Sequence, residues 1–176
     1  MHKGSHIKKL PLSVKEQMRL LRKNKSVRVK VLLTLFLSKG IHPICLSKPR
    51  KYELDWNDTQ VSWKRSKTRK LITSSWGKLI KHDLKALRGV IGLTKQRYWQ
   101  IVKKAGEQAG IHNLCPLKLR YTYFCNRGRI GHHPYDISVS SGTSMSTVEN
   151  YYIVGKEEMK GLNDEEITFL KDLIEP

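Results

Sequence analysis

The stretch from Cys115 to Tyr152 restricts the possible fold and function of this chain more than any other stretch. Arg120 lies near the start of a predicted helix, Gly142 marks a later turn, and the pair Tyr151 and Tyr152 follows. This order can bring a guanidinium group and a phenol to the same phosphate, because arginine binds phosphate oxygens in a bidentate way and tyrosine can act as a nucleophile. The stretch therefore suits chemistry on the phosphodiesters of nucleic acid.

Several short motifs of this stretch follow one another in a known order. They are Leu119-Arg120-Tyr121-Thr122, Gly131, Ile137, Gly142 and Thr147-Val148-Glu149-Asn150-Tyr151. Together they resemble the second half of a tyrosine recombinase (phage integrase) catalytic domain, whose pattern is HxLRHT, then G, then LGH, then TTxxY. The spacings from Arg120 to Gly131 and to Gly142 match that family without a gap, whereas the stretch from Gly142 to Tyr151 is one residue short. Tyr151 is therefore the preferred counterpart of the family's nucleophile, and Tyr152 is the alternative that needs no gap.

The length of 176 residues allows one domain with a sizeable core. The resemblance implies a mainly helical α+β fold over residues 12–154, similar to the tyrosine recombinase catalytic domain, with a small antiparallel β-sheet. We expect residues 1–11 to form a basic flexible arm and residues 155–176 to form an acidic C-terminal helix. This helix would either pack on its own domain or exchange between protomers of a homo-oligomer, and both alternatives are open.

The charge of the chain is strongly positive and unevenly distributed. Its 34 lysines and arginines against 15 acids give a net charge of +19, which indicates a polyanionic partner such as nucleic acid. Seven of the acids lie in residues 155–176, so the first 154 residues carry 31 bases and 8 acids. We therefore expect duplex DNA, contacted through its phosphate backbone, as the partner, with the acidic tail away from it.

Apolar periodicity and turn residues predict the secondary structure. Helices are expected after the capping box that begins at Ser13, and over Ser26–Ser38, Ser74–Leu87 and Thr94–Gly110. Strands are expected over Tyr52–Trp56 and Gln60–Lys64. The inner face of the helix Thr94–Gly110 is expected to consist of Trp99, Val102, Ala105 and Ala109.

The basic segment from Trp63 to Lys70 resembles the β-hairpin of the recombinase family with its R-x-K-T motif. The resemblance implies that Lys67 is the general acid that protonates the leaving 5′ oxygen. The residues alone favour a solvated or phosphate-contacting basic turn, and either interpretation places this turn on DNA. The basic residues expected at the DNA are Lys64, Arg65, Arg69, Lys70, Lys95, Arg97, Arg127 and Arg129.

Three catalytic groups of the family are replaced in this sequence. Arg120, Lys67 and a tyrosine are retained, but His42 stands for the first arginine, and Leu117 and Thr143 stand for two histidines. The loss of one preorganised donor typically costs on the order of 10²–10³ in rate. Charging of His42, or donation from Thr143 or a nearby arginine, would compensate in part. We therefore expect a DNA-binding protein of the tyrosine recombinase type, related to DNA integration and site-specific recombination, with weakened or lost strand transfer.

Two other functions are open. The first is an active integrase or recombinase that cleaves DNA through a 3′-phosphotyrosine, and the second is a basic RNA-binding protein. No cofactor and no metal are expected. Zinc ligands could come from His112, Cys115, Cys125, His132 and His133, but their spacing matches no compact zinc signature.

The sequence also predicts the compartment. The longest apolar run, around Val31–Leu37, is too short to span a bilayer, and no signal peptide pattern is found. Three cysteines without a secretory signal favour reduced thiols. We expect an intracellular protein without membrane contact, in the cytoplasm or nucleoid or in a virus-infected cell.

Overall fold

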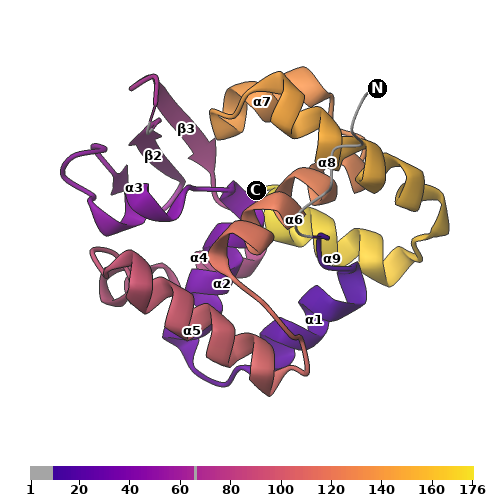
Figure 1. The fold of residues 1–176 in the computed structure, drawn as a ribbon, viewed down its shortest axis with the longest axis horizontal. Helices are drawn as coiled ribbons and strands as arrows, with labels where there is room; N and C mark the ends of the chain where they lie inside the picture. The colour runs from indigo at the N-terminus through magenta and orange to yellow at the C-terminus, as the bar shows by residue number, and fades with distance from the viewer. Residues whose placement is uncertain (1–9, 66) are drawn as a thin grey trace, which may run out of the picture.

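The computed structural model describes residues 10–65 and 67–176 (Figure 1). The predicted basic arm, apart from Leu10 and Pro11, lies outside the described residues, as does Ser66. The described elements are α1 (Val14–Lys23), α2 (Val27–Lys39), α3 (Pro43–Ser47), β1 (Asp55–Trp56), β2 (Gln60–Lys64), β3 (Leu71–Ser75), α4 (Lys78–Lys81), the 3-10 helix η1 (Leu84–Gly89), α5 (Lys95–Gln108), α6 (Pro116–Arg129), α7 (Pro134–Ser141), α8 (Met145–Glu158), the 3-10 helix η2 (Met159–Gly161) and α9 (Asp164–Ile174).

The predicted fold class is confirmed, because the described chain is mainly helical with one small antiparallel sheet. The strand order is β1-β2-β3, and Trp63 of β2 pairs with Ile72 of β3. The sheet lies at the upper left of Figure 1, and α6 crosses the middle of the molecule with α7 and α8 on one side and α5 on the other. Helix α2 is buried from Val31 to Lys39, contacts α6 and forms the centre of the larger core. A second cluster of buried residues joins α6, α7 and α8.

Local signals in the sequence explain several boundaries. Ser13 and Glu16 form the predicted capping box of α1, since each side chain accepts a hydrogen bond from the other's backbone N–H. Helix α2 follows its N-cap Ser26 and ends at Gly40, as its apolar pattern predicts. These two helices were therefore predictable from the sequence alone.

The helix predicted over Ser74–Leu87 is wrong. Residues Leu71–Ser75 form the edge strand β3, and only the short α4 and η1 follow. Pairing with β2 satisfies the backbone groups of Ser74 and Ser75, so a tertiary partner overrides the helical periodicity at the start of the predicted helix. Trp76 is buried, with its indole N–H donating to the Asn57 carbonyl at 2.7 Å, and Leu79 is exposed.

The predicted inner face of α5 is wrong by one residue. Val102, Ala105 and Ala109 are buried, but Trp99 is 47% exposed, and Tyr98 takes the inner position instead. The Tyr98 hydroxyl donates to the Val90 carbonyl at 2.7 Å, which satisfies the one polar atom of this buried side chain.

Helix α9 packs on its own chain in this structure. Leu170, Leu173 and Ile174 are buried, and the amide of Lys78 donates to the Glu175 carbonyl at 3.2 Å. The ammonium group of Lys39, at the end of α2, donates to the carbonyls of Ser75 and Ile174 and so ties β3 and α9 together. Exchange of α9 between protomers stays a prediction. No helix within residues 10–65 and 67–176 has the length and apolar character needed to cross a membrane.

Candidate phosphate site

A pocket of about 460 Å³ lies where α3, the β2–β3 hairpin, α6 and the α7–α8 turn meet. Four residues that were singled out from the sequence line it together: His42, Lys67, Arg120 and Thr143. Three cationic side chains and several hydroxyl groups line a pocket in which no described carboxylate takes part. This combination is suited to an anion with several oxygen atoms, such as a phosphodiester.

Arg120 is the most firmly held cation of the pocket. Its guanidinium donates to the carbonyl of Gly40 and, at 2.5 Å, to the hydroxyl of Thr143, and it lies 5.5 Å from the ring centroid of Phe124. Burial lowers the pKa of Arg120 to about 10, so that it remains charged at pH 7. With several donors in a planar fork and two partners that fix its plane, it has donors left for a phosphate oxygen.

The glycine turn brings Thr143 to Arg120. Gly142 ends α7 with a φ of +66°, a left-handed conformation that costs a glycine little. A β-carbon at this position would also collide with the side chain of Arg65 from the hairpin. The turn therefore needs glycine both for its backbone and for the close approach of the hairpin.

His42 does not replace the charge of the missing arginine. Its Nδ1 accepts a hydrogen bond from the Ile44 amide at 3.2 Å and so caps α3. The pKa of the His42 imidazole is lowered to about 4, first by burial. The nearby cations of Arg120, Lys95 and Lys67 contribute the rest. At pH 7 the ring is neutral with its proton on Nε2, so it can donate one hydrogen bond but adds no positive charge.

Two further residues that line the pocket are uncharged. Cys45 of α3 is buried, and burial raises the pKa of its thiol to about 11. Its Sγ donates to the Lys64 carbonyl at 3.7 Å. Leu117 lines the pocket with an apolar side chain in place of a histidine. Neither residue can accept or donate a proton at pH 7 as the family groups would.

The hairpin cations that were predicted to contact DNA lie in different surroundings. Arg65 lines the pocket beside Lys67, while Lys64 forms an ion pair with Glu53 at 2.5 Å. Arg69 lies 5.3 Å from the ring centroid of Tyr52, and Lys70 is exposed. On α5, Lys95 and Arg97 are both exposed.

The prediction that Arg129 contacts DNA is wrong. Its side chain is 1% exposed, and its guanidinium donates to Glu158 at 2.5 and 2.8 Å and to Asn126 at 2.7 Å. A buried cation must keep its partners, so this arginine ties α6 to α8 instead of reaching phosphate. Arg127 is half-buried and donates to the Tyr123 hydroxyl at 3.0 Å. It lines a separate hollow between β3 and α7.

Tyr151 is not among the described residues that line the pocket. It is 8% exposed, and its ring stacks on that of Tyr121, with centroids 4.4 Å apart and planes 7° apart. Burial raises the pKa of the Tyr151 phenol to about 12, and Tyr121 contributes to the shift. Tyr121 itself does line the pocket, so the preferred nucleophile stacks on a pocket residue. Tyr152 is half-buried with Lys156 6.0 Å from its ring centroid, and it is not among the described lining residues either.

The predictions from the sequence missed the contribution of hydroxyl groups to the pocket. Ser141, Ser144 and Thr147 line the pocket on the α7–α8 side. The available signal was the run from Ser140 to Ser144, in which only Gly142 lacks a hydroxyl. Such groups can donate to phosphate oxygens without any change of charge.

A second, larger hollow of about 860 Å³ lies between the α1–α2 turn and one flank of α5. It is lined by four cations, Lys23, Lys25, Arg97 and Lys104, but it combines them with no tyrosine or imidazole. The smaller pocket around Arg120 is therefore the candidate for chemistry. No three His, Cys, Asp or Glu side chains within residues 10–65 and 67–176 come together as a metal site would require.

No protein-family model and no curated protein matches the sequence of the chain. Solved structures match it by fold. XerA recombinase has 18% sequence identity and a TM-score of 0.66 over 99% of this chain and 66% of that chain. XerH recombinase, bound to a palindromic difH substrate, has 17% identity and a TM-score of 0.68 over 90% of this chain and 54% of that one. The λ integrase dimer bound to a COC′ core site has 14% identity and a TM-score of 0.64 over 86% of this chain and 62% of that one.

The chain thus spans between about half and two thirds of the length of these chains. At such identities the similarity establishes the fold and leaves the activity to be argued from the site. The described residues have the fold of the tyrosine recombinase catalytic domain.

Proposed function

We propose that this protein binds duplex DNA through the pocket around Arg120, in a role related to recombination or integration, with weakened or absent strand transfer. The observation that carries the proposal is the meeting of three cations, Arg120, Lys67 and Arg65, in one pocket with no described carboxylate. Arg120 is held in place before any ligand binds, so little ordering is needed when a phosphate enters.

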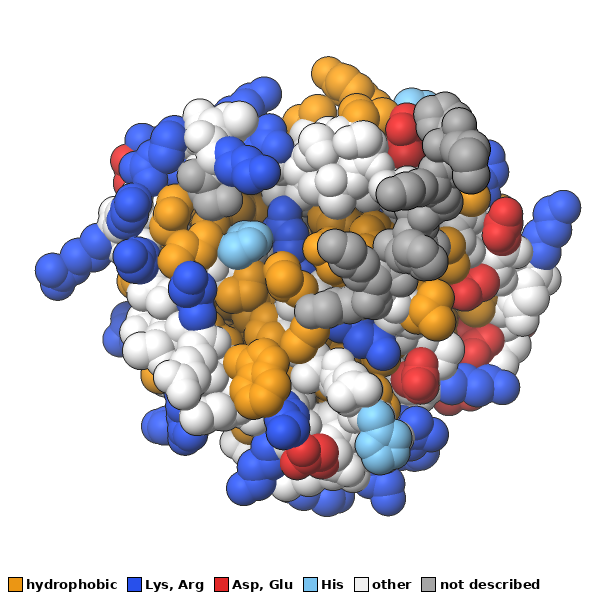
Figure 2. All heavy atoms as spheres, in the orientation of Figure 1, with side chains coloured by type: hydrophobic (Ala, Val, Ile, Leu, Met, Phe, Trp, Pro, Cys, Tyr) orange, Lys and Arg blue, Asp and Glu red, His pale blue; other side chains and the backbone are white. Residues whose placement is uncertain are grey.

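The distribution of charge supports DNA as the ligand. Figure 2 shows Lys and Arg side chains along the left and lower edges, over the sheet and α5, whereas Asp and Glu gather mainly at the right, near the end of α8 and α9. A surface with one basic side and one acidic side orients a polyanion toward the basic side. The XerH and λ integrase structures are themselves complexes with DNA.

The chemistry of the pocket supports the loss of strand transfer. A tyrosine that attacks phosphorus needs a proton acceptor and cationic stabilisation of the developing charge. Here His42 is neutral at pH 7, Leu117 has no polar atom, and the phenol of Tyr151 is buried with a raised pKa. The pocket retains the groups that bind phosphate and lacks several that would activate a nucleophile.

The test is incubation with nicked suicide duplexes of varied sequence, followed by denaturing electrophoresis, with fluorescence anisotropy on the same duplexes. We expect binding that weakens about 10³–10⁵-fold between 50 and 200 mM salt, as for six to ten phosphate contacts. We expect no covalent adduct. A shallow salt dependence would contradict the phosphate-binding role.

An active recombinase is the second candidate, and one observation favours it. Lys67 and Arg120 share the pocket with Thr147, which lies one helical turn before Tyr151 on α8. If Tyr151 left its stack with Tyr121, the phenol would lie on the same side of the helix as a pocket residue. An adduct that is lost in Tyr151→Phe but kept in Tyr152→Phe would establish this activity and identify the nucleophile.

A further inference from the structure

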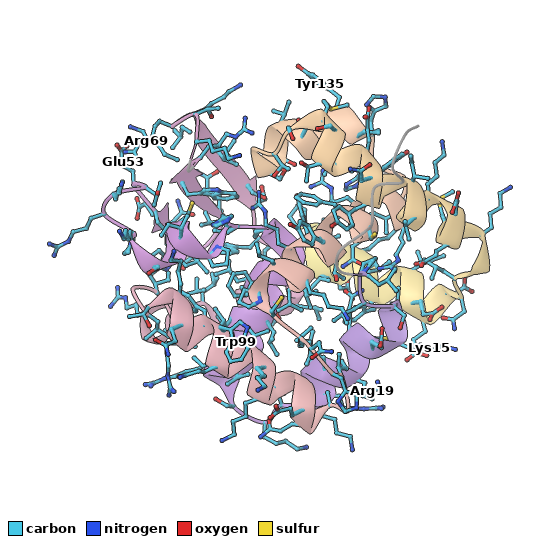
Figure 3. All side chains as sticks on the ribbon, in the orientation of Figure 1. Lys15, Arg19, Glu53, Arg69, Trp99 and Tyr135 are labelled. Carbon is cyan, nitrogen blue, oxygen red and sulfur yellow. The ribbon has the colours of Figure 1, made fainter. Side chains whose placement is uncertain are left out.

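Trp99 on α5 is exposed to an unusual degree for a tryptophan. It is 47% exposed, whereas Trp63 is 2% exposed, Trp76 is fully buried and Trp56 is half-buried. The helix phase explains this, because Tyr98 and Val102 turn inward and leave the neighbouring indole outside the core. Figure 3 marks Trp99 on α5, and Figure 2 shows an apolar side chain exposed at that place.

The indole lies between two lysines on one side of the helix. Lys95 and Lys103 are four residues before and after Trp99, which places all three side chains in one row. The ammonium group of Lys103 lies 5.0 Å from the centroid of the indole ring and 3.9 Å from a carboxylate oxygen of Glu107. The row thus presents an exposed aromatic ring with Lys95 one helical turn before it and the Lys103 ammonium over the ring.

This row starts beside the candidate phosphate site. Helix α5 begins at Lys95 and contacts α3, whose N-cap His42 lines the pocket with Arg120. One helical step of four residues advances the chain by about 6 Å. The phosphates of one strand of duplex DNA follow one another at about 3.4 Å along the duplex axis. Lys95 and Lys103 are eight residues apart, which is about 12 Å along α5, so the row spans about three nucleotides of one strand.

We propose that Trp99 contacts a nucleotide next to the phosphate held in the Arg120 pocket. The indole packs on the sugar and base edge, while Lys95 and Lys103 bind phosphates further along the same strand, one on each side of this contact. The contact extends the proposed DNA-binding function and rests on it. Positive charge on both sides of the indole selects a polyanion that also has apolar surface, and DNA has both.

The contact has a definite energetic signature. Burial of the indole against the sugar and base edge contributes about 1–2 kcal/mol, so Trp99→Leu is expected to weaken duplex binding about 5- to 30-fold. The phosphate contacts remain in this variant, so the slope of affinity against salt stays the same. In Lys95→Gln or Lys103→Gln the same slope falls by about one phosphate contact each. Trp99→Tyr, which keeps an aromatic ring, retains most of the affinity.

Fluorescence offers a readout that does not depend on activity. Trp99 is the most exposed of the four tryptophans, so acrylamide quenches its emission most strongly in the free protein. Addition of duplex DNA should change that emission and protect it from acrylamide, and Trp99→Leu should abolish both effects. Trp56→Phe serves as the matched control, because it removes a half-buried tryptophan of the sheet.

The outcomes separate this inference from the proposed function. If the native protein binds duplex DNA, and Trp99→Leu binds equally well with no change of emission in either, the contact is disproved and DNA binding stands. If the native protein binds no duplex DNA at any salt concentration, both are disproved. An equal melting temperature for the native protein and Trp99→Leu shows that a loss of affinity arises at the surface.

Discussion

The Arg120 pocket and the surroundings of Tyr151 both include residues of α6, but the pocket is suited to bind a phosphate whereas Tyr151 is not placed to attack one. The pocket is open, and its main cation is held by Gly40 and Thr143 before any phosphate arrives. Tyr151 lies in a stack with Tyr121, 8% exposed and with a raised pKa. Binding of phosphate and attack on it are therefore separable properties in this molecule.

The packing of α8 on α6 accounts for the difference. A β-carbon at Gly155 would collide with the backbone of Cys125, so the two helices approach as closely as their backbones allow. The Cys125 thiol also donates to the Tyr151 carbonyl at 2.8 Å. Such contacts fix the helix that carries the tyrosine, whereas two of the three pocket cations, Arg65 and Lys67, come from the hairpin.

The largest expected effect is a loss of stability in Arg129→Ala, which distinguishes an arginine that stabilises the fold from one that binds DNA. Arg129→Ala removes a buried guanidinium and is expected to cost about 2–4 kcal/mol of unfolding free energy, because Glu158 and Asn126 lose their partner. Urea denaturation measures this cost, and anisotropy should show DNA affinity unchanged within about twofold. Arg69→Ala is the matched control, since this exposed arginine is expected to affect affinity and not stability. An unchanged unfolding free energy together with a loss of DNA affinity in Arg129→Ala would show that Arg129 contacts DNA.

Removal of the central cation of the pocket is expected to affect binding next most strongly. Arg120→Ala removes charge-assisted hydrogen bonds of about 1.5–3 kcal/mol, so duplex affinity should fall roughly 10- to 100-fold while the domain still folds. Arg120→Lys keeps the charge but not the planar fork, and an intermediate affinity is expected. A collapsed thermal transition in Arg120→Ala would mark the residue as structural instead.

Acid should lower the free energy of unfolding through protonation of His42. The folded-state pKa of about 4 lies below the ordinary value of 6.5, so the unfolded chain takes up the proton first. Stability is therefore lost as the pH falls below 6.5, by at most about 1.4 kcal/mol per unit, and the loss stops growing below about pH 4. The difference in unfolding free energy between the native protein and His42→Asn, measured from pH 7 to 4, isolates this effect from the carboxylates. A difference independent of pH would contradict the lowered pKa.

The smallest effect tests the stack of Tyr151 on Tyr121. Tyr121→Leu removes an aromatic pair and should cost about 1 kcal/mol of stability. The pKa of Tyr151 should also fall from about 12 toward 10 as the phenol gains solvent. Titration of ¹³C-labelled tyrosine by NMR measures the pKa, and Tyr121→Phe, which keeps the ring, should leave it raised. An unchanged pKa in Tyr121→Leu would show that other residues bury the phenol.

Much of this molecule could be predicted from local patterns. The capping box at Ser13, the apolar run that forms α2 and the alternation in β2 each appear in the structure, because each depends on residues close in sequence. Strand β3 was missed because its partner is β2, and the exposure of Trp99 was missed because Tyr98 is equally apolar and adjacent. Residue type alone does not choose between neighbours when either could complete a helical face.

The sequence by itself determined that the chain is strongly basic, mainly helical, and ordered like the second half of a recombinase catalytic domain from Arg120 to Tyr151. Only the tertiary structure decided that His42, Lys67, Arg120 and Thr143 share one pocket, that Arg129 is buried, and that Tyr151 is stacked outside the site. The physical reason is that charge and periodicity are properties of residues in order along the chain. Burial, pKa and access to a ligand depend on which distant segments pack together.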